Sequence, residues 1–407
     1  MLTSLALVFL IGLALASICQ KLKLPRIIGM LITGILLGPY VLNLFDESIL
    51  GISADLRQMA LVIILIKAGL SLNIQDLKKV GRPAVLMSFL PALFEILAFV
   101  VFAPPVLGVN YIEAAIMGAV LGAVSPAVVV PRMVQLMDEG YGTDKRIPQL
   151  ILAGASLDDV FVIVLFSTFI SMAQGSGARI MDFVNIPISI VLGILLGAIL
   201  GYVLAWFFET NYSHRHLVRN SVKVIIVLGV SFLLLAIEDM LEGIIAVSGL
   251  LAVMSMAMVL AMRSVPEVTG RLQEKYGKLW LAAEVILFVL VGAAVDIRYT
   301  LHAGVAAIGM IFLALVFRSF GVLLSLLGTP LNIKEKIYCV IAYLPKATVQ
   351  AAIGSIPLSL GLSCGNMVLS VAVLSIVLTA PLGAFGMDLT YKKLLTGGAW
   401  KEEQAPF

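Results

Sequence analysis

The stretch AGASLDDVFVIVLF, residues 153–166, places two adjacent acids, Asp158 and Asp159, inside an apolar run. The run extends from residue 147 to residue 173, and at about 1.5 Å per residue it is long enough to cross the roughly 30 Å of bilayer hydrocarbon. A charged side chain at the middle of a bilayer is unfavourable by at least ~3 kcal/mol, so acids within a membrane segment are candidate functional groups. The stretch therefore predicts a transmembrane helix that carries a functional carboxylate pair.

The composition of the whole chain agrees with a membrane location. Hydrophobic residues make up 61% of the 407 residues and charged residues 13%, against about 25% charged residues in an ordinary soluble domain. The net charge is +3 and the basic residues form no stripe, which argues against a nucleic-acid partner. The three cysteines lie in apolar segments without the spacing of a zinc site or a disulfide framework.

Apolar runs between polar breaks predict an all-α polytopic membrane protein of about thirteen transmembrane helices. The expected spans are approximately 2–19, 26–43, 55–75, 83–104, 110–134, 147–173, 185–208, 217–237, 244–263, 279–296, 302–327, 334–360 and 365–388. Nearly all Lys and Arg residues of the loops fall in alternate loops, and the opposite loops hold only Arg57, Arg179 and Arg298. The positive-inside rule then places the N-terminus outside and the C-terminus inside a cytoplasmic membrane.

Two of these spans contain internal breaks. Residues 122–126 (GAVSP) interrupt the fifth span before Pro126, and residues 343–348 (YLPKAT) interrupt the twelfth around Pro345, Lys346 and Thr348. Proline removes a helix hydrogen bond and leaves a carbonyl free, which a membrane tolerates only where protein or a cavity covers the backbone. Two kinked structural helices are the simpler alternative. Six spans, a linker and six spans would place the breaks at matching positions of two inverted repeats, an arrangement typical of secondary transporters.

Five further ionisable residues lie within the expected spans. They are Lys67, Glu95, Glu284, Arg318 and Lys346. Arginine does not lose its proton in proteins, so Arg318 requires a carboxylate partner, either Glu95 or one of the two aspartates. We expect Glu95, which otherwise lies in an apolar span without a partner, although this pair could serve helix packing alone. Lys346 follows Pro345 directly, and we expect it to offset the carbonyl end of a half-helix.

Three segments together resemble the cation–proton antiporters, and most closely their NHA-type sodium/proton exchanger branch. They are GAVSPAVVVP at 122–131, GASLDD at 154–159 and LPKATVQAAIG at 344–354, and the resemblance runs through nearly the whole chain. It implies an NhaA-like fold with two broken crossing helices, a core that moves like an elevator against a scaffold, and a homodimer formed by that scaffold.

The resemblance also implies roles for individual residues. Asp159 matches the essential cation-binding acid, and Asp158 matches its neighbour. Arg318 matches a position where NhaA-like electrogenic relatives have a lysine, which can release a proton. Glu95 resembles the acid that pairs with this arginine in the NHA branch, and the arginine leaves the transport stoichiometry open.

The same resemblance divides the chain into parts. We expect scaffold and dimerisation helices at 1–75 and 217–296, core transport helices at 83–173 and 302–388, a linker helix at 185–208 and a cytoplasmic tail at 389–407.

The resulting functional hypothesis is a secondary antiporter that exchanges Na⁺ or Li⁺ for H⁺ and needs no cofactor. Hard cations prefer oxygen ligands, which Asp158, Asp159, the Ser125 hydroxyl and freed backbone carbonyls could supply. Adjacent buried acids raise each other's proton affinity, so cation and proton would compete for one site.

An intramembrane aspartyl protease would need two carboxyls that converge on one water, whereas neighbours on a helix point about 100° apart. A cation channel or a sodium-coupled substrate symporter remains the alternative to antiport.

Overall fold

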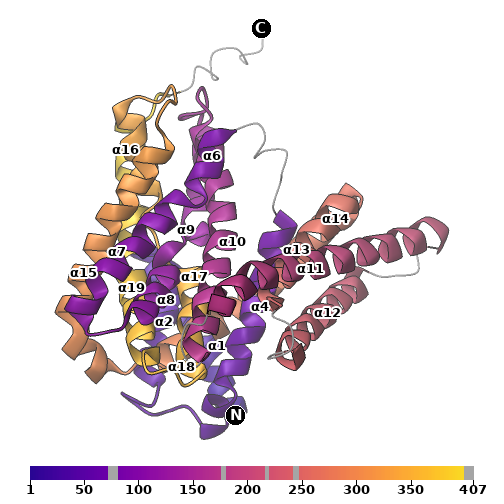
Figure 1. Ribbon diagram of the computed structural model, residues 1–407, viewed down its shortest axis with the longest axis horizontal. Coiled ribbons are helices and arrows are strands. Elements are labelled where there is room, and N and C mark those ends of the chain that lie inside the picture. The colour runs from indigo at the N-terminus through magenta and orange to yellow at the C-terminus, as the bar shows by residue number, and fades with distance from the viewer. Residues whose placement is uncertain (72–80, 176–179, 216–219, 242–246, 398–407) are drawn as a thin grey trace. The chain divides into compact units, whose positions relative to one another are not determined.

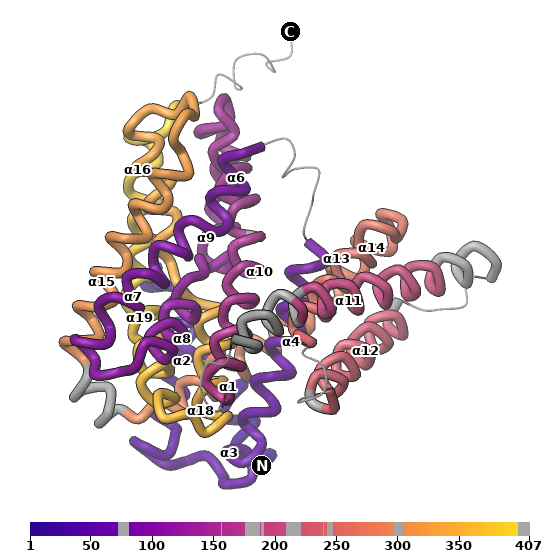
Figure 2. Tube along the Cα trace, in the orientation of Figure 1, coloured from indigo at the N-terminus to yellow at the C-terminus, as the bar shows by residue number. Residues whose placement is uncertain are grey.

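The computed structural model describes residues 1–71, 81–175, 180–215, 220–241 and 247–397, and in these ranges the secondary structure is helical apart from one isolated bridge between Tyr141 and Gly397. The chain forms two compact units. The first unit comprises Met1–Glu47, Asn73–Val162 and Phe288–Phe407, and the second comprises Ser48–Leu72 and Ile163–Leu287. Figure 1 labels the helices and Figure 2 traces the chain.

Nine helices of the described ranges are long and apolar enough to cross a membrane, and two shorter apolar helices, Arg26–Leu37 and Gly249–Arg263, accompany them. The prediction of an all-α multi-pass membrane protein is therefore confirmed. The count of about thirteen spans and the two inverted repeats stay predictions. The expected spans at 55–75, 217–237 and 244–263 and the tail at 389–407 lie partly outside the described residues.

The first unit contains most of the helices. Its complete helices are α1 (Leu2–Lys21), α2 (Arg26–Leu37), α6 (Arg82–Met87), α7 (Leu90–Leu107), α8 (Tyr111–Gly122), α9 (Pro126–Glu139), α15 (Ile297–Ser325), α16 (Ile333–Ala342), α17 (Thr348–Gly354), α18 (Ile356–Ser359) and α19 (Gly365–Leu394). Two long helices, α10 (Ile147–Gln174) and α14 (Pro266–Ala293), contribute residues to both units, as does the short α3 (Glu47–Gly51).

Helix α7 packs along both α8 and α15 in the first unit, and small residues permit the close approach. A Cβ on Gly118 of α8 would lie 2.8 Å from the Cα of Ile96, and a Cβ on Gly321 of α15 would lie 2.7 Å from the Cα of Pro91. Glycine therefore holds the backbones of these helices closer than a larger residue would allow, as at many helix interfaces in membranes.

The structure interrupts the helices at both expected places. Helix α8 ends at Gly122, the backbone is extended at Ala123 and Ser125, and α9 begins with Pro126 at a position where a missing N–H costs nothing. Helix α16 ends at Ala342 and α17 begins at Thr348. The two breaks are in direct contact, because the Ser125 N–H donates to the Pro345 carbonyl at 2.8 Å.

Matching signals begin the half-helices α8 and α16. Asn110 precedes α8 and Asn332 precedes α16, and each forms a reciprocal capping box with the glutamate three residues later, Glu113 and Glu335. Both caps satisfy backbone N–H groups at the helix start. The sequence patterns NYIE and NIKE thus mark where each broken span begins.

The second unit is built around a contact between α11 (Ile180–Arg215) and α13 (Gly249–Arg263). Gly193, Gly197 and Gly201 lie four residues apart on one face of α11, and a Cβ on any of them would overlap the backbone of α13 at Ser248, Ala252 or Met256. Such small-residue stripes allow helices to pack backbone to backbone in a membrane. The remaining helices of this unit are α4 (Ser53–Ser71) and α12 (Asn220–Leu241).

We expect Gly197→Ala to lower the thermal stability of the protein, because the added methyl group would overlap the Ala252 backbone. Overpacking of this kind typically costs about 1–3 kcal/mol. Gly229→Ala on α12 is the matched control, because a Cβ there meets no atom within 4 Å. Equal melting temperatures for the two purified variants would contradict this account of the α11–α13 contact.

Candidate functional site

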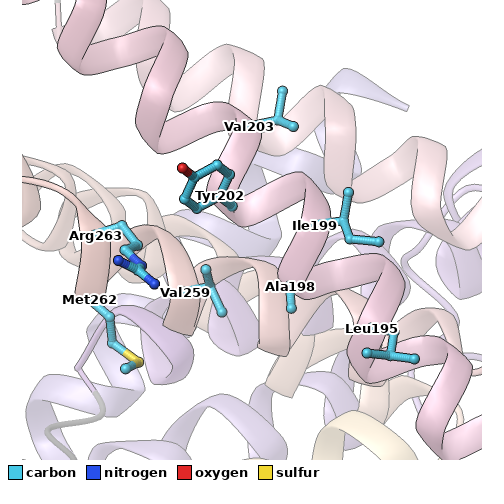
Figure 3. Close-up of a pocket in the computed structure, with 8 residues that line it drawn as sticks. All are labelled: Leu195, Ala198, Ile199, Tyr202, Val203, Val259, Met262 and Arg263. Atoms are coloured by element: carbon cyan, nitrogen blue, oxygen red, sulfur yellow. The ribbon is translucent and has the colours of Figure 1, made fainter.

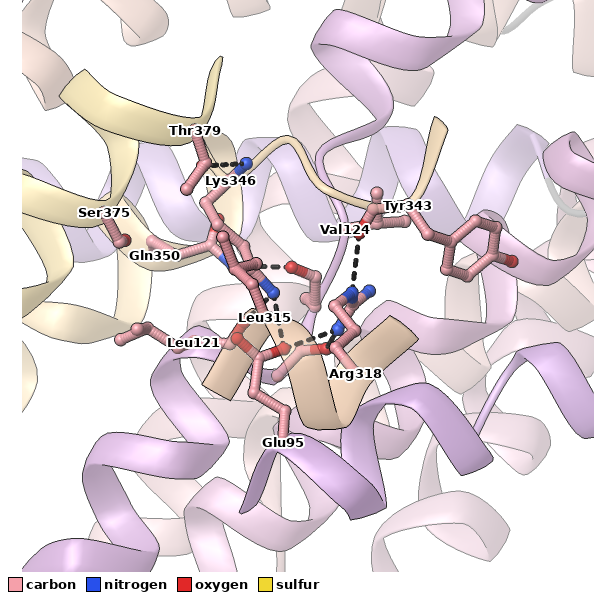
Figure 4. Close-up of polar contacts among 12 residues, drawn as sticks. Glu95, Leu121, Val124, Leu315, Arg318, Tyr343, Lys346, Gln350, Ser375 and Thr379 are labelled. Carbon is pink, nitrogen blue, oxygen red and sulfur yellow. Dashed lines mark hydrogen bonds and ion pairs between the residues drawn. The ribbon is translucent and has the colours of Figure 1, made fainter. Parts of the chain in front are cut away.

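Five ionisable side chains lie in the interior of the first unit, and Figure 4 labels three of them, Glu95, Arg318 and Lys346. Glu95 comes from α7, Asp158 and Asp159 from α10, Arg318 from α15 and Lys346 from the second break. None of the five side chains belongs to a residue more than 7% exposed. Ionised groups buried to this extent require compensation by opposite charges and hydrogen bonds.

Arg318 contacts groups from four segments. Its Nη1 lies 2.7 Å from Glu95 Oε2 and its Nη2 lies 3.1 Å from Asp158 Oδ2. Nη1 also donates to the Gly122 carbonyl, and Nε donates to the Tyr343 carbonyl at 2.6 Å. The guanidinium therefore joins two carboxylates and the carbonyl ends of the half-helices α8 and α16. The sequence offered Glu95 or an aspartate as its partner, and the guanidinium contacts both Glu95 and Asp158.

Lys346 occupies the other side of Glu95. Its Nζ lies 2.6 Å from Glu95 Oε2 and also donates to the Leu121 carbonyl. Gln350 Nε2 donates to the Ala123 carbonyl at 2.8 Å. Arg318 donates to the Gly122 carbonyl that lies between these two. Three consecutive carbonyls at the end of α8 therefore accept hydrogen bonds from side chains of the second break, α15 and α17. Lys346 thus contacts a half-helix carbonyl end, where its positive charge opposes the helix dipole.

The amide groups of the first break are satisfied as well. The Val124 N–H donates to Asp158 Oδ2 at 2.8 Å, and the Ser125 N–H donates to the Pro345 carbonyl. Asp158 therefore accepts from the backbone of the first break and from Arg318. Its carboxylate links α10 to the first break and to α15.

The second break uses polar side chains of its neighbours. The Lys346 N–H donates to Thr379 Oγ1 of α19 at 2.9 Å, and the Ala347 N–H donates to Gln350 Oε1 at 2.7 Å. Thr348 is buried as the first residue of α17. Backbone groups freed by the break are thereby paired inside the protein, as the membrane requires.

The charges of this cluster do not cancel when all groups are ionised. Three carboxylates, Glu95, Asp158 and Asp159, face two cations, Arg318 and Lys346. Within the described ranges, Asp159 forms no ion pair with a basic side chain, and its Oδ1 is buried without a hydrogen-bond partner. One negative charge therefore remains, and it is centred on Asp159.

Several other oxygen atoms of the cluster are buried without a donor. These are Glu95 Oε1, Ser125 Oγ, Asp158 Oδ1 and Tyr343 Oη. An unpaired buried polar atom costs about 1–3 kcal/mol, so a group of them indicates a place where another polar species binds. Oxygen atoms with one excess negative charge suit a monovalent hard cation or a proton.

The other charged residues expected within spans lie elsewhere. Lys67 of α4 interacts with Glu284 of α14 in the second unit, and its Nζ lies 5.9 Å from the centre of the Trp280 ring. Their contacts are those of a separate pair that joins α4 to α14.

Sequence reasoning did not single out Gln350, Thr379 or the Tyr343 side chain. All three are buried in segments that are otherwise apolar. A polar residue in such a segment needs an internal partner, which is the signal that could have identified Gln350 and Thr379.

A separate groove of about 430 Å³ lies in the second unit between α11 and α13 (Figure 3). Its lining is apolar except for Tyr202 and Arg263, whose guanidinium lies 5.6 Å from the Tyr202 ring. The lining contains no acid, so this groove does not resemble a cation site.

A family model described as "Sodium/hydrogen exchanger, transmembrane" matches residues 5–389. Human sodium/hydrogen exchanger 9B2 is 34% identical over 385 residues, which are 91% of this chain and 70% of that protein. Mouse sodium/hydrogen exchanger 9B1 is 33% identical over 384 residues, 91% of this chain and 66% of that protein. The sodium proton antiporter MjNhaP1 from Methanocaldococcus jannaschii has the same fold, with a TM-score of 0.81, 24% identity, and coverage of 97% of this chain and 98% of that one.

The contact between Glu95 and Arg318 can be tested by its coupling energy. We expect Glu95→Gln and Arg318→Gln each to lower thermal stability strongly, since breaking a buried pair costs about 3–5 kcal/mol. The double variant should recover part of the loss, because neither partner then remains as an unpaired charge. Strictly additive changes in the free energy of unfolding would show that the two residues do not act as a pair.

Proposed function

The chain belongs to the sodium/hydrogen exchanger family, and we propose that it exchanges Na⁺ for H⁺ at the Asp158–Asp159 pair. The protein is a multi-pass membrane transporter of monovalent cations and protons, and not an enzyme that converts a substrate chemically. The observation that carries the proposal is the single uncompensated charge on Asp159 beside buried oxygens that lack donors. Lithium has the same preference for oxygen ligands as sodium, and we include it as a second transported ion.

In this proposal Asp159 binds either a proton or a cation. A proton neutralises its carboxylate in one state, and Na⁺ neutralises it in the other. Asp158 Oδ1 and the Ser125 hydroxyl are the further oxygens, because both are buried and unpaired beside the first break. The empty, ionised site is unfavourable in a low dielectric, so release of one ion favours binding of the other.

The charge balance also suggests a stoichiometry. Arg318 contacts Glu95 and Asp158, and Lys346 contacts Glu95 again. The positive charges of Arg318 and Lys346 thus lie against two of the three carboxylates and favour their ionised form. Only Asp159 is then left to exchange its proton, and we propose one proton for each Na⁺.

Alternating access completes the proposal. All five residues of the cluster come from the expected core ranges 83–173 and 302–388, which supports a core that carries the ion as one body. We propose that this core moves like an elevator against a scaffold made of residues 1–75 and 217–296, with 185–208 as the linker. The scaffold would form a homodimer. The distribution of Lys and Arg supports an N-terminus outside and the 389–407 tail inside the cytoplasmic membrane.

Replacement of Asp159 tests the cation site directly. Asp159→Asn keeps the shape of the side chain and removes the charge, so we expect Na⁺-dependent proton movement to fall at least about 100-fold, the size of effect for loss of an essential charged group in a buried site. The assay is dequenching of a pH-sensitive dye in proteoliposomes. Asp138→Asn, an exposed site on α9, should remain active as the control. Near-normal exchange by Asp159→Asn would show that the cation site lies elsewhere in the protein.

The one-for-one stoichiometry has its own test. We expect the rate of Na⁺-driven proton movement in proteoliposomes to be unchanged when a potassium gradient with valinomycin imposes a membrane potential, because no net charge crosses. A rate that rises and falls with the imposed potential would indicate a second proton and reject the assignment of Asp158 to Arg318. Sodium flux without coupled proton flux would favour the channel or the symporter.

A further inference from the structure

Tyr343 is a buried polar residue that the exchange cycle described above does not use. It follows the last residue of α16 and has no solvent exposure. Its carbonyl accepts from Arg318 Nε, and its ring lies 5.6 Å from the Arg318 guanidinium. These contacts explain why the backbone and ring are held in place. They do not explain the hydroxyl, which is buried without a hydrogen-bond partner.

The hydroxyl points away from the Arg318–Glu95 contacts (Figure 4) and toward α10. It lies against Gly154, where any Cβ would overlap it, and Met87 of α6 lies beside the same glycine. A glycine at this position of α10 therefore makes room for a phenolic oxygen. A phenylalanine would keep the ring and leave the space of this oxygen empty.

Gly154 relates this oxygen to the aspartate pair. Residues four apart lie on one face of a helix, separated by about 6 Å along its axis. The Tyr343 hydroxyl thus lies about one turn from Asp158, toward the beginning of α10. It is also close enough to interact electrostatically with Asp158, Asp159 and Arg318.

The beginning of α10 corresponds to the cytoplasmic side in the proposed orientation. Helix α10 follows Lys145 and Arg146, and α16, which leads to Tyr343, starts beside Lys334 and Lys336. Both helices thus approach the aspartate pair from the side rich in basic residues. A cation that arrives from that side would meet the unpaired hydroxyl one helical turn before it reaches the carboxylates.

We propose that the Tyr343 hydroxyl is a ligand for Na⁺ on the cytoplasmic path to the Asp158–Asp159 pair. This inference rests on the proposed exchange function and adds a residue to it. A hydroxyl oxygen is a neutral hard ligand of the kind Na⁺ accepts, and it replaces part of the hydration shell before the carboxylates complete the site. Tyr343 would affect how readily Na⁺ enters from one side, and not whether Asp159 can bind it.

The test is Tyr343→Phe, which keeps the ring over Arg318 and removes only the oxygen. Everted membrane vesicles expose the cytoplasmic face to added Na⁺, and right-side-out vesicles expose the other face. We expect the KM for Na⁺ in everted vesicles to rise about five- to tenfold, the effect of one lost polar contact. The KM in right-side-out vesicles should remain unchanged. Tyr338→Phe is the matched control, because this tyrosine is also buried, within α16, but interacts with Asp388 and Arg132.

Each other outcome overturns a defined part of the inference. An unchanged KM in both vesicle types would remove the hydroxyl from the cation path. An increase confined to right-side-out vesicles, or equal in both, would overturn its placement on the cytoplasmic side. Absence of exchange in the unmodified protein would instead overturn the proposed function, and this inference with it.

A second experiment tests the position of the hydroxyl without transport. Gly154→Ala should lower the melting temperature because its methyl group overlaps the hydroxyl. In a Tyr343→Phe background the nearest ring atom is the Cζ at 3.3 Å, so the same substitution should cost less stability. An equal loss in both backgrounds would show that the hydroxyl does not occupy this space.

Discussion

The contacts of the Arg318 guanidinium are the interaction on which the rest of the site depends. Each broken helix ends with carbonyl groups that have no partner within the helix and with the negative end of its dipole. Arg318 donates to the Gly122 carbonyl of one half-helix and to the Tyr343 carbonyl of the other. Only a planar group with several donors in fixed directions can satisfy both ends and two carboxylates at once. The arginine at this position therefore holds both breaks and both acids together.

A permanent positive charge at the crossing determines what the neighbouring acids can do. Arg318 contacts the carboxylates of both Glu95 and Asp158, and Lys346 adds a second basic group to Glu95. These four groups together are neutral, so they resemble a structural core more than a transport site. Asp159 is outside this balance, and in the proposed function it is the group whose charge is cancelled by different ions. The cluster has three acids and two basic residues. In the proposed function the extra acid exchanges ions, while the other four groups hold the helices together.

The two units use different means to hold helices together in a membrane. In the second unit, glycines four residues apart on α11 bring its backbone against α13, and dispersion forces supply the attraction. In the first unit, α7, α8 and α15 also approach through glycine, but buried charges and broken helices are added at their centre. Close packing there is the condition for the electrostatics, since it excludes water from the charges and strengthens their interaction.

The sequence by itself determined the class of protein and several features of the site. The apolar runs specified membrane helices, because the bilayer requires length and composition that are visible locally. Pro126 and Pro345 located the breaks, since proline removes a hydrogen bond wherever it stands. The adjacent aspartates and the buried arginine were recognisable because charges in apolar segments have no local explanation. The need of Arg318 for a carboxylate followed from its chemistry alone.

Only the tertiary structure decided how these groups meet. Arg318 lies 223 residues from Glu95 and 160 residues from Asp158 along the chain, and it contacts both because its two Nη atoms point in different directions. The sequence presents the two acids as alternatives, whereas the packing of α7, α10 and α15 brings both within reach. Gln350 and the Tyr343 hydroxyl depend in the same way on carbonyls and a glycine from distant segments. Such contacts depend on where helix backbones cross, which is set by side-chain packing over the whole unit and not by any local pattern.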